Sequence, residues 1–248
     1  MKNVFTFLLL LFSLLCNGQS PKLFTTDKEL SSSLINQIYQ DRNGFIWIAT
    51  EDGLNRYDGA KFTIYKHEPN NEHSLAHNFV RTVFEDSKGH LLIGTYIGIQ
   101  MYDPATDNFT PLAKLEDTGE TLESNINSFI ERKNGEIWVS GNVLCKLDIK
   151  DHLLTVRKVD IAVTSPGSLF EDKKQNVWMA KGEEGVYQLT PDNQLTLHLS
   201  KDNGYVKSIC EDQRGNIYVG SIRKGLFIYD KERKTFVPVD LKEKGELP

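Results

Sequence analysis

Acidic pairs are the residues of this 248-residue chain that could most directly carry out chemistry. Glycoside hydrolysis needs two carboxylates, one on each side of a sugar bond. The pairs Glu85-Asp86, Glu171-Asp172 and Glu211-Asp212 recur, however, at the same place before a turn. Such recurrence indicates a turn-capping role in a repeat rather than one active site. We therefore predict no catalytic residue.

Two histidines, His73 and His77, are spaced four apart and would share one face of a helix, as metal ligands can. The asparagine-rich segment around them is typical of a linker, and no carboxylate follows His73 as it does in metalloprotease helices. The sequence also lacks a P-loop and a Gly-x-Ser-x-Gly elbow. It predicts neither a metal site nor a cofactor.

Polar side chains that could contact a ligand recur eight residues before a turn that is found five times. They are Asn36, Arg81, Asn127 and Lys207, and the fourth copy has Gly167 at this position. If the strand that carries them is the innermost one, these side chains reach a central channel. Arg81 and Lys207 would then hold an anionic or polar sugar. Polar residues that line a wet tunnel without a partner are the alternative.

Five copies of one pattern position these residues. The turn recurs every 40 to 46 residues, at Gly44, Gly89, Gly135, Gln175 and Gly215. In each copy we expect short runs rich in β-branched and aromatic residues to form a four-stranded antiparallel meander. Four-stranded sheets at this period are typical of a β-propeller, an all-β fold. The expected blades span residues 32–67, 78–113, 125–158, 166–200 and 204–240.

An aromatic side chain follows the turn by three residues in four of the five copies, at Trp47, Trp138, Trp178 and Tyr218. Recurrence at one strand position favours packing between adjacent sheets, where an aromatic ring buries a large apolar area. Stacking on a carbohydrate is the alternative. We predict that these four residues form the blade core. The glycines of the turn supply the positive φ that a tight turn requires.

The first 18 residues resemble a secretory signal peptide. Lys2 precedes an apolar run from Val4 to Leu15, and small residues precede a cut before Gln19. Lipidation of Cys16 stays open as an alternative to its removal. The two later cysteines, Cys145 and Cys210, are expected to be small buried hydrophobes. Export of the chain follows from this interpretation.

The charge pattern argues against nucleic acid as a partner. The formal net charge is −5, and lysines and arginines form no basic patch in the sequence. Five blades without further copies would leave two apolar blade faces exposed to solvent. We therefore expect residues 19–248 to be part of a longer propeller, interrupted before its next blade.

The segment SSLINQIYQDRNGFIWIATEDGLNRYDGAKFTIYKH, residues 32–67, resembles the first two-component regulator propeller repeat of certain sensors. These are the periplasmic sensor regions of hybrid two-component systems in gut and marine Bacteroidetes. The resemblance covers nearly all of the chain after the signal. Copies three and four depart from it, because they lack the Gly-Leu after the second strand, and copy four lacks the turn glycine.

The resemblance implies a periplasmic sensor of carbohydrate breakdown products. In that family two seven-bladed propellers lead to a small β-sandwich, a transmembrane helix in the inner membrane and a cytoplasmic histidine kinase. The implied partners are an oligosaccharide or other small periplasmic ligand, the remaining propeller and kinase portions, and a second copy of the chain. No kinase motif is present in these residues. A secreted propeller enzyme acting on polysaccharide and a protein-binding scaffold are the alternative functions.

Overall fold

The structure is a computed structural model that describes residues 23–26, 29–199 and 204–239. The described secondary structure consists of β-strands that form five sheets. The expected signal peptide, residues 1–18 with Cys16, lies outside the described residues, as do residues 240–248. Within the described ranges, no helix is long and apolar enough to cross a membrane.

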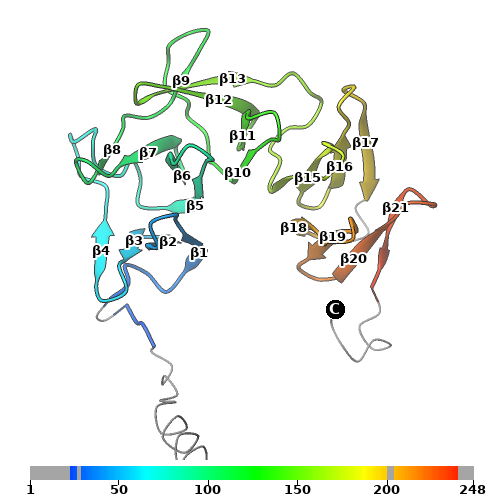
Figure 1. Ribbon diagram of the computed structural model, residues 1–248, viewed down its shortest axis with the longest axis horizontal. Helices are drawn as coiled ribbons and strands as arrows, with labels where there is room; N and C mark the ends of the chain where they lie inside the picture. The colour runs from blue at the N-terminus through cyan, green and yellow to red at the C-terminus, as the bar shows by residue number, and fades with distance from the viewer. Residues whose placement is uncertain (1–22, 27–28, 200–203, 240–248) are drawn as a thin grey trace, which may run out of the picture.

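Each repeat forms one antiparallel sheet whose strands follow chain order (Figure 1). The first sheet contains β1 (Ile35–Gln40), β2 (Ile46–Thr50), β3 (Gly53–Tyr57) and β4 (Phe62–Tyr65). The second contains β5 (Val80–Glu85), β6 (Leu91–Thr95), β7 (Ile99–Asp103) and β8 (Asn108–Phe109). The third contains β10 (Ser128–Glu131), β11 (Ile137–Ser140), β12 (Leu144–Lys150) and β13 (Leu153–Lys158).

The last two sheets repeat the same meander. The fourth contains β14 (Leu169–Glu171), β15 (Val177–Lys181), β16 (Gly185–Leu189) and β17 (Leu195–Leu199). The fifth contains β18 (Val206–Glu211), β19 (Ile217–Ser221), β20 (Gly225–Asp230) and β21 (Thr235–Pro238). The prediction of an all-β propeller fold is confirmed.

A short strand that the sequence did not predict extends the third sheet. β9 (Lys114–Leu115) comes from the connection before this sheet and pairs in parallel with β13. The amide of Glu116 continues the pairing by donating to the carbonyl of Val156 at 2.9 Å. β9 thus covers an outer edge whose backbone groups would otherwise be unpaired.

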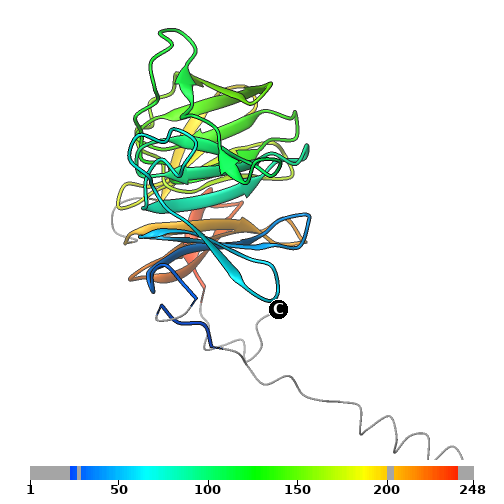
Figure 2. The same ribbon diagram turned by 90° about the vertical axis from the view of Figure 1, so that its left-hand side faces the viewer.

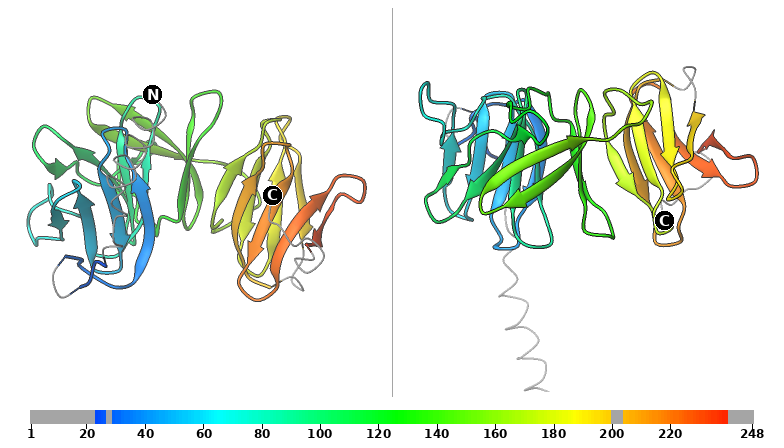
Figure 3. Two further views of the ribbon diagram at one scale, coloured as in Figure 1. Left: turned by 60° about the horizontal axis from the view of Figure 1, so that its bottom comes forward. Right: turned by 90° about the horizontal axis from the view of Figure 1, so that it is seen from above.

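The sheets stand side by side in an arc around an open centre (Figure 1), and Figures 2 and 3 show the same sheets from the side, from below and from above. The first strand of a sheet lies nearest the centre, and the last strand lies at the outside, as seen for β1 and β4 or β18 and β21 (Figure 1). This order brings the first strands of different repeats together. Residues about 40 apart in sequence therefore become neighbours at the centre.

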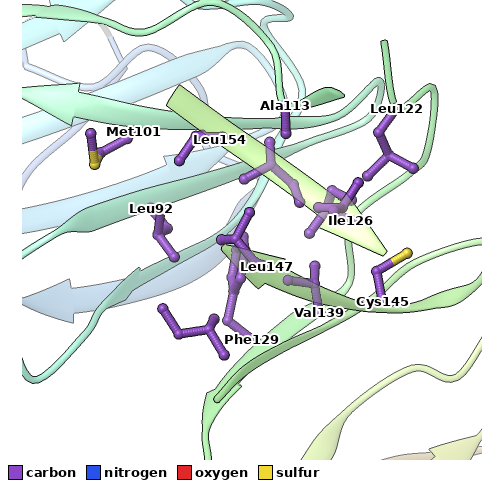
Figure 4. Packing of buried hydrophobic residues seen from close by; sticks show 13 residues of the cluster. Leu92, Met101, Ala113, Leu122, Ile126, Phe129, Val139, Cys145, Leu147 and Leu154 are labelled. Carbon is purple, nitrogen blue, oxygen red and sulfur yellow. The ribbon is translucent and has the colours of Figure 1, made fainter. Parts of the chain in front are cut away.

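Apolar clusters fill the spaces between consecutive sheets. There are four such clusters in the described residues, one for each pair of neighbouring sheets. Trp47, Trp138 and Trp178 are buried in three of them. Figure 4 shows the cluster between the second and third sheets, where Leu92 takes the place of the aromatic residue. Because each cluster takes side chains from two sheets, no sheet buries its faces alone.

The outward faces at the two ends of the arc are more exposed than their counterparts between sheets. Ile38 on β1 is 61% exposed, whereas Val83 at the same repeat position on β5 is 1% exposed. At the other end, Cys210 on β18 is exposed, so the expectation that it is buried was wrong. Its counterpart Phe170 packs against the fifth sheet. Cys145 lies between sheets and is buried as expected.

The aspartate of the recurring turn organises the turn and its aromatic residue. Asp41 Oδ1 accepts the amides of Asn43 and Phe45 at 2.9 and 3.0 Å, while its Oδ2 accepts Trp47 Nε1 at 2.8 Å. Asp172 and Trp178 form the same contact at 2.9 Å. At the turn position φ is positive throughout, at Gly44 (88°), Gly89 (94°), Gly135 (82°), Gln175 (67°) and Gly215 (79°).

The glutamate of each acidic pair has a different role from the expected turn cap, because it reaches the preceding sheet. The backbone amide of Arg42 donates to Glu85 at 2.8 Å, and the amide of Lys133 donates to Glu171 at 2.7 Å. Ser87 with Glu131 and Lys173 with Glu211 repeat the contact at 2.7 and 3.2 Å. One glutamate thus joins each pair of neighbouring sheets. These carboxylates are engaged in structure.

In the third sheet a different residue accepts the hydrogen bond from the tryptophan ring. Arg132 occupies the place of the turn aspartate, and Trp138 Nε1 instead donates to Glu136 at 3.0 Å. Lys146 Nζ contacts the other oxygen of Glu136 at 2.5 Å. Burial alone would raise the pKa of Glu136, but the hydrogen bonds from Lys146 and Trp138 outweigh it and lower the pKa to about 2. The charged carboxylate is therefore the form that the fold stabilises.

We expect the stabilising effect of Glu136 to disappear in acid. A lowered pKa in the folded state contributes stability above the ordinary value of 4.5, and this contribution is lost as the pH falls from 4.5 towards 2. At pH 7, Glu136→Gln should cost about 1 kcal/mol, a modest figure because the side chain is 34% exposed and screened by solvent. Urea unfolding at several pH values measures this difference. Exposed Glu123→Gln is the control, and a cost of Glu136→Gln that stays constant down to pH 2 would contradict the assignment.

Candidate functional site

A cavity of about 300 Å³ lies where the first strands meet at the centre of the arc. Residues from all five repeats line it. They include all five residues of the predicted ligand position, namely Asn36, Arg81, Asn127, Gly167 and Lys207. The remaining lining residues are Gln37, Thr82, Ser128, Ser165, Ser168, Gly182, Tyr205 and Val206. Hydroxyl, amide and cationic groups dominate this lining.

Local irregularities in the strands lie at the predicted ligand position. The register between β1 and β2 shifts between Ile35 and Gln37, which leaves Asn36 as the extra residue of a β-bulge. The same shift isolates Arg81 on β5 and Lys207 on β18. A bulge re-aims the side chain of its extra residue out of the regular alternation. This explains how residues beside buried Val80 and Val206 line a cavity instead of packing in the core.

Two asparagines of the cavity also connect neighbouring sheets. Asn36 Nδ2 donates to the carbonyl of Val80 at 2.8 Å, and Asn127 Nδ2 donates to the carbonyl of Pro166 at 3.1 Å. Both acceptors belong to the repeat that follows. An amide side chain has further donor and acceptor capacity beyond one such bond. These residues can therefore hold two sheets together and still present polar groups to the cavity.

The two cations differ in their surroundings. Arg81 is half-buried, and its Nη1 donates to Asn125 Oδ1 at 3.1 Å. Its guanidinium carbon lies 5.7 Å from the centre of the Phe79 ring. Lys207 is exposed. Among the described residues, neither Arg81 nor Lys207 forms an ion pair with a carboxylate.

Tyr205 and Ser168 are among the lining residues that sequence reasoning missed. Tyr205 is 46% exposed although it is a large aromatic residue, and it precedes β18 by one position. The hydroxyl of Ser168 is buried and has no hydrogen-bond partner within the described structure. Phe79 and Tyr205 occupy the same repeat position, directly before the first strand of their sheets. The recurrence of an aromatic residue at this position was a usable signal for Tyr205. The sequence carried no signal for Ser168.

The histidines that suggested a metal lie in the connection before β5 and serve local contacts. His73 Nδ1 lies 3.1 Å from the carbonyl oxygen of Phe109, and His77 Nδ1 accepts the amide of Phe79 at 2.9 Å. In the part of the chain that the structure describes, no group of three or more His, Cys, Asp or Glu side chains could hold a metal ion.

Comparison with known proteins identifies the repeat. The two-component regulator propeller family matches residues 29–52, 74–96 and 200–223. Among curated proteins, Histidine kinase P4 of Formosa agariphila is 37% identical over 83 residues. That match covers 31% of this chain and 6% of the kinase. The chain thus corresponds to a small part of the length of this relative.

Solved structures share the fold. The extracellular domain of a B. thetaiotaomicron one-component system aligns with a TM-score of 0.71 at 18% identity, over 90% of this chain and 33% of that one. A Staphylococcus aureus virginiamycin B lyase aligns with a TM-score of 0.63 at 13% identity, over 88% of this chain and 72% of the lyase. At these identities the likeness shows the fold alone.

The family matches fall on the repeats themselves. Each of the three matched segments contains the first strand, the turn and the second strand of one sheet. The segments belong to the first, second and fifth repeats. These elements carry both the cavity residues and the sheet-to-sheet contacts described above. Three of the five repeats thus match the two-component regulator propeller family, and the chain has the fold of the extracellular domain of a B. thetaiotaomicron hybrid two-component system.

Proposed function

We propose that this chain is the ligand-sensing propeller region of an extracytoplasmic two-component receptor, and that its ligand binds in the central cavity. The observation that carries this proposal is the composition of the cavity, because every one of the five repeats contributes lining residues. A ligand there contacts several sheets at once. Its binding therefore stabilises one arrangement of the sheets over others, which is what a ligand must do to switch a receptor.

The chemistry of the lining suits an oligosaccharide released from a complex carbohydrate. Asn36, Asn127 and Ser165 offer amide and hydroxyl groups to sugar hydroxyls. Tyr205 offers an exposed ring against which the apolar face of a sugar can pack. In this proposal the chain lies in the periplasm and passes the signal to the kinase portions of the same receptor, with a second copy of the chain as a further partner.

The proposed role is binding without bond making. The recurring glutamates and aspartates, which would be the natural catalytic acids of a glycosidase, hold neighbouring sheets together or cap turns. The fold shared with a virginiamycin B lyase supports an exported enzyme as the second candidate. Turnover of polysaccharide by the purified chain would favour that candidate.

Ligand binding is expected to depend on the two cations of the cavity. At about 100 times the dissociation constant, a bound oligosaccharide should stabilise the chain by about 2.7 kcal/mol. Arg81→Ala and Lys207→Ala should each weaken this binding, measured by calorimetric titration with short acidic oligosaccharides. Lys231→Ala, which removes an exposed charge from the turn between β20 and β21, is the matched control. Unchanged affinity in both cavity variants would exclude the cavity as the ligand site.

A further inference from the structure

The central cavity has a charge opposite to that of the chain. The chain carries a formal net charge of −5. The cavity lining, in contrast, contains Arg81 and Lys207 and no aspartate or glutamate. From this contrast and the contacts below, we infer that the cavity selects an anionic oligosaccharide, one that carries a carboxylate or a sulfate ester. The inference rests on the proposed function and specifies its ligand class.

Arg81 is the strongest element of this site because its charge is half-buried without an opposite charge. Two other arginines that are more than half-buried are paired, Arg56 with Asp107 and Arg132 with Glu171, both at 2.9 Å. The hydrogen bond that Arg81 donates goes instead to the neutral amide oxygen of Asn125. Taking a charge out of water without pairing it is costly. A ligand oxyanion would compensate this charge.

The setting of Arg81 keeps its guanidinium available to such a ligand. Asn125 holds Nη1, and the Phe79 ring lies beside the guanidinium carbon at 5.7 Å. A guanidinium has five N–H donors in a planar fork, so one bond to Asn125 leaves several of them. A carboxylate or sulfate can accept two parallel hydrogen bonds from this fork. The contacts therefore fix the orientation of Arg81 without using its capacity for an anion.

Lys207 adds a second positive charge from the other end of the arc. It occupies the same bulged position in β18 that Arg81 occupies in β5, and both line one cavity. Lys207 is exposed. Its ammonium group is a point charge on a flexible aliphatic chain, so it can meet an anion in several positions. An anion bound by both residues would connect the second sheet to the fifth across the centre.

The remaining groups distinguish a sugar from a free inorganic anion. Tyr205, 46% exposed, presents a ring at the cavity. The amide side chains of Asn36 and Asn127 line the same space. Inorganic phosphate or sulfate would use the cations alone. An acidic oligosaccharide would use the cations, the ring and the amides together.

The test compares matched acidic and neutral ligands by calorimetric titration of the 248-residue chain. One arm uses oligogalacturonates and their methyl esters, and a second uses alginate oligosaccharides and reduced, neutral counterparts. A third arm uses sulfated galactan oligosaccharides and desulfated counterparts, and inorganic sulfate is tested alone. We expect an acidic oligosaccharide to bind at least about tenfold more tightly than its neutral counterpart, with an affinity that falls as salt is added. The arm that binds distinguishes a carboxylate from a sulfate ester.

The variants separate charge recognition from folding. Arg81→Gln and Lys207→Met should each reduce the affinity for the acidic ligand about tenfold and leave the neutral counterpart unaffected, whereas Lys207→Arg should retain binding. Lys231→Met controls for the change in net charge. Equal binding of acidic and neutral members would overturn the inference and leave the proposed function standing. Binding of inorganic sulfate as tightly as the sulfated sugar would also overturn it, and binding of no oligosaccharide in any arm would overturn both.

Discussion

Val83→Asp is expected to destabilise the chain by more than about 4 kcal/mol, whereas Ile38→Asp should cost less than about 1 kcal/mol. Both residues occupy the same position of the repeat, on β5 and β1. Val83 is 1% exposed and lies in the cluster between the first two sheets. An aspartate there would bury a charge among Leu54, Val80 and Ile93 without a partner. Ile38 is 61% exposed, so its replacement stays in water.

Chemical unfolding followed by tryptophan fluorescence measures this difference, because Trp47 lies in the same cluster as Val83. Val83→Ala and Ile38→Ala extend the pair with changes that introduce no charge. A large cost for Ile38→Asp would mean that the outer face of the first sheet is covered in solution. A small cost for Val83→Asp would mean that the first two sheets do not pack together as described.

Trp47→Ala is expected to destabilise the chain by about 3 to 5 kcal/mol. Trp47 is fully buried, and its ring lies 4.8 Å from the ring centre of Tyr102 and 5.9 Å from that of Tyr65. The substitution leaves a cavity between two sheets and also removes the donor that satisfies Asp41 Oδ2. Trp47→Phe should cost less, because it keeps most of the apolar area and removes mainly this donor.

The control for this prediction comes from the same repeat position in the fifth sheet. Tyr218 is only partly buried, and its hydroxyl lies 3.4 Å from Asp212 Oδ2. Tyr218→Ala should therefore cost less than half as much as Trp47→Ala, measured as the shift in unfolding midpoint in urea. Equal costs at the two positions would show that burial between sheets does not set the contribution of this aromatic residue.

The roles within the acidic pairs show where local sequence reasoning stops. A turn signature is read over a few residues, so the capping by Asp41 and Asp172 follows from the sequence. Glu85 and Glu171, by contrast, contact amides of the preceding sheet, about 40 residues earlier in the chain. The exchange in the third repeat is local, because Glu136, which replaces the missing aspartate as the partner of Trp138, lies two residues before it, but the turn signature does not include this position.

The candidate cavity was predicted in part. The repeat register placed Asn36, Arg81, Asn127 and Lys207 at equivalent positions, and the structure brings them to one cavity. Whether they bind a ligand stays a prediction. The hydrogen bonds of these residues were not predictable, because they connect different repeats. Arg81 donates to Asn125, and Asn36 donates to the carbonyl of Val80. Ser168 entered the site only through the arrangement of the sheets, whereas Tyr205 shares its repeat position with Phe79.

By itself, the sequence determined the repeat period, the four-stranded meander and the turns, because strand propensity and positive φ at a turn are local properties. It also determined which strand position would carry polar side chains. Only the tertiary structure decided which carboxylates join neighbouring sheets, that β9 would complete the edge of the third sheet, and that Cys210 and Ile38 would be exposed. These outcomes depend on which sheet lies next to which. Packing between segments 40 residues apart sets that neighbourhood, and no local pattern encodes it.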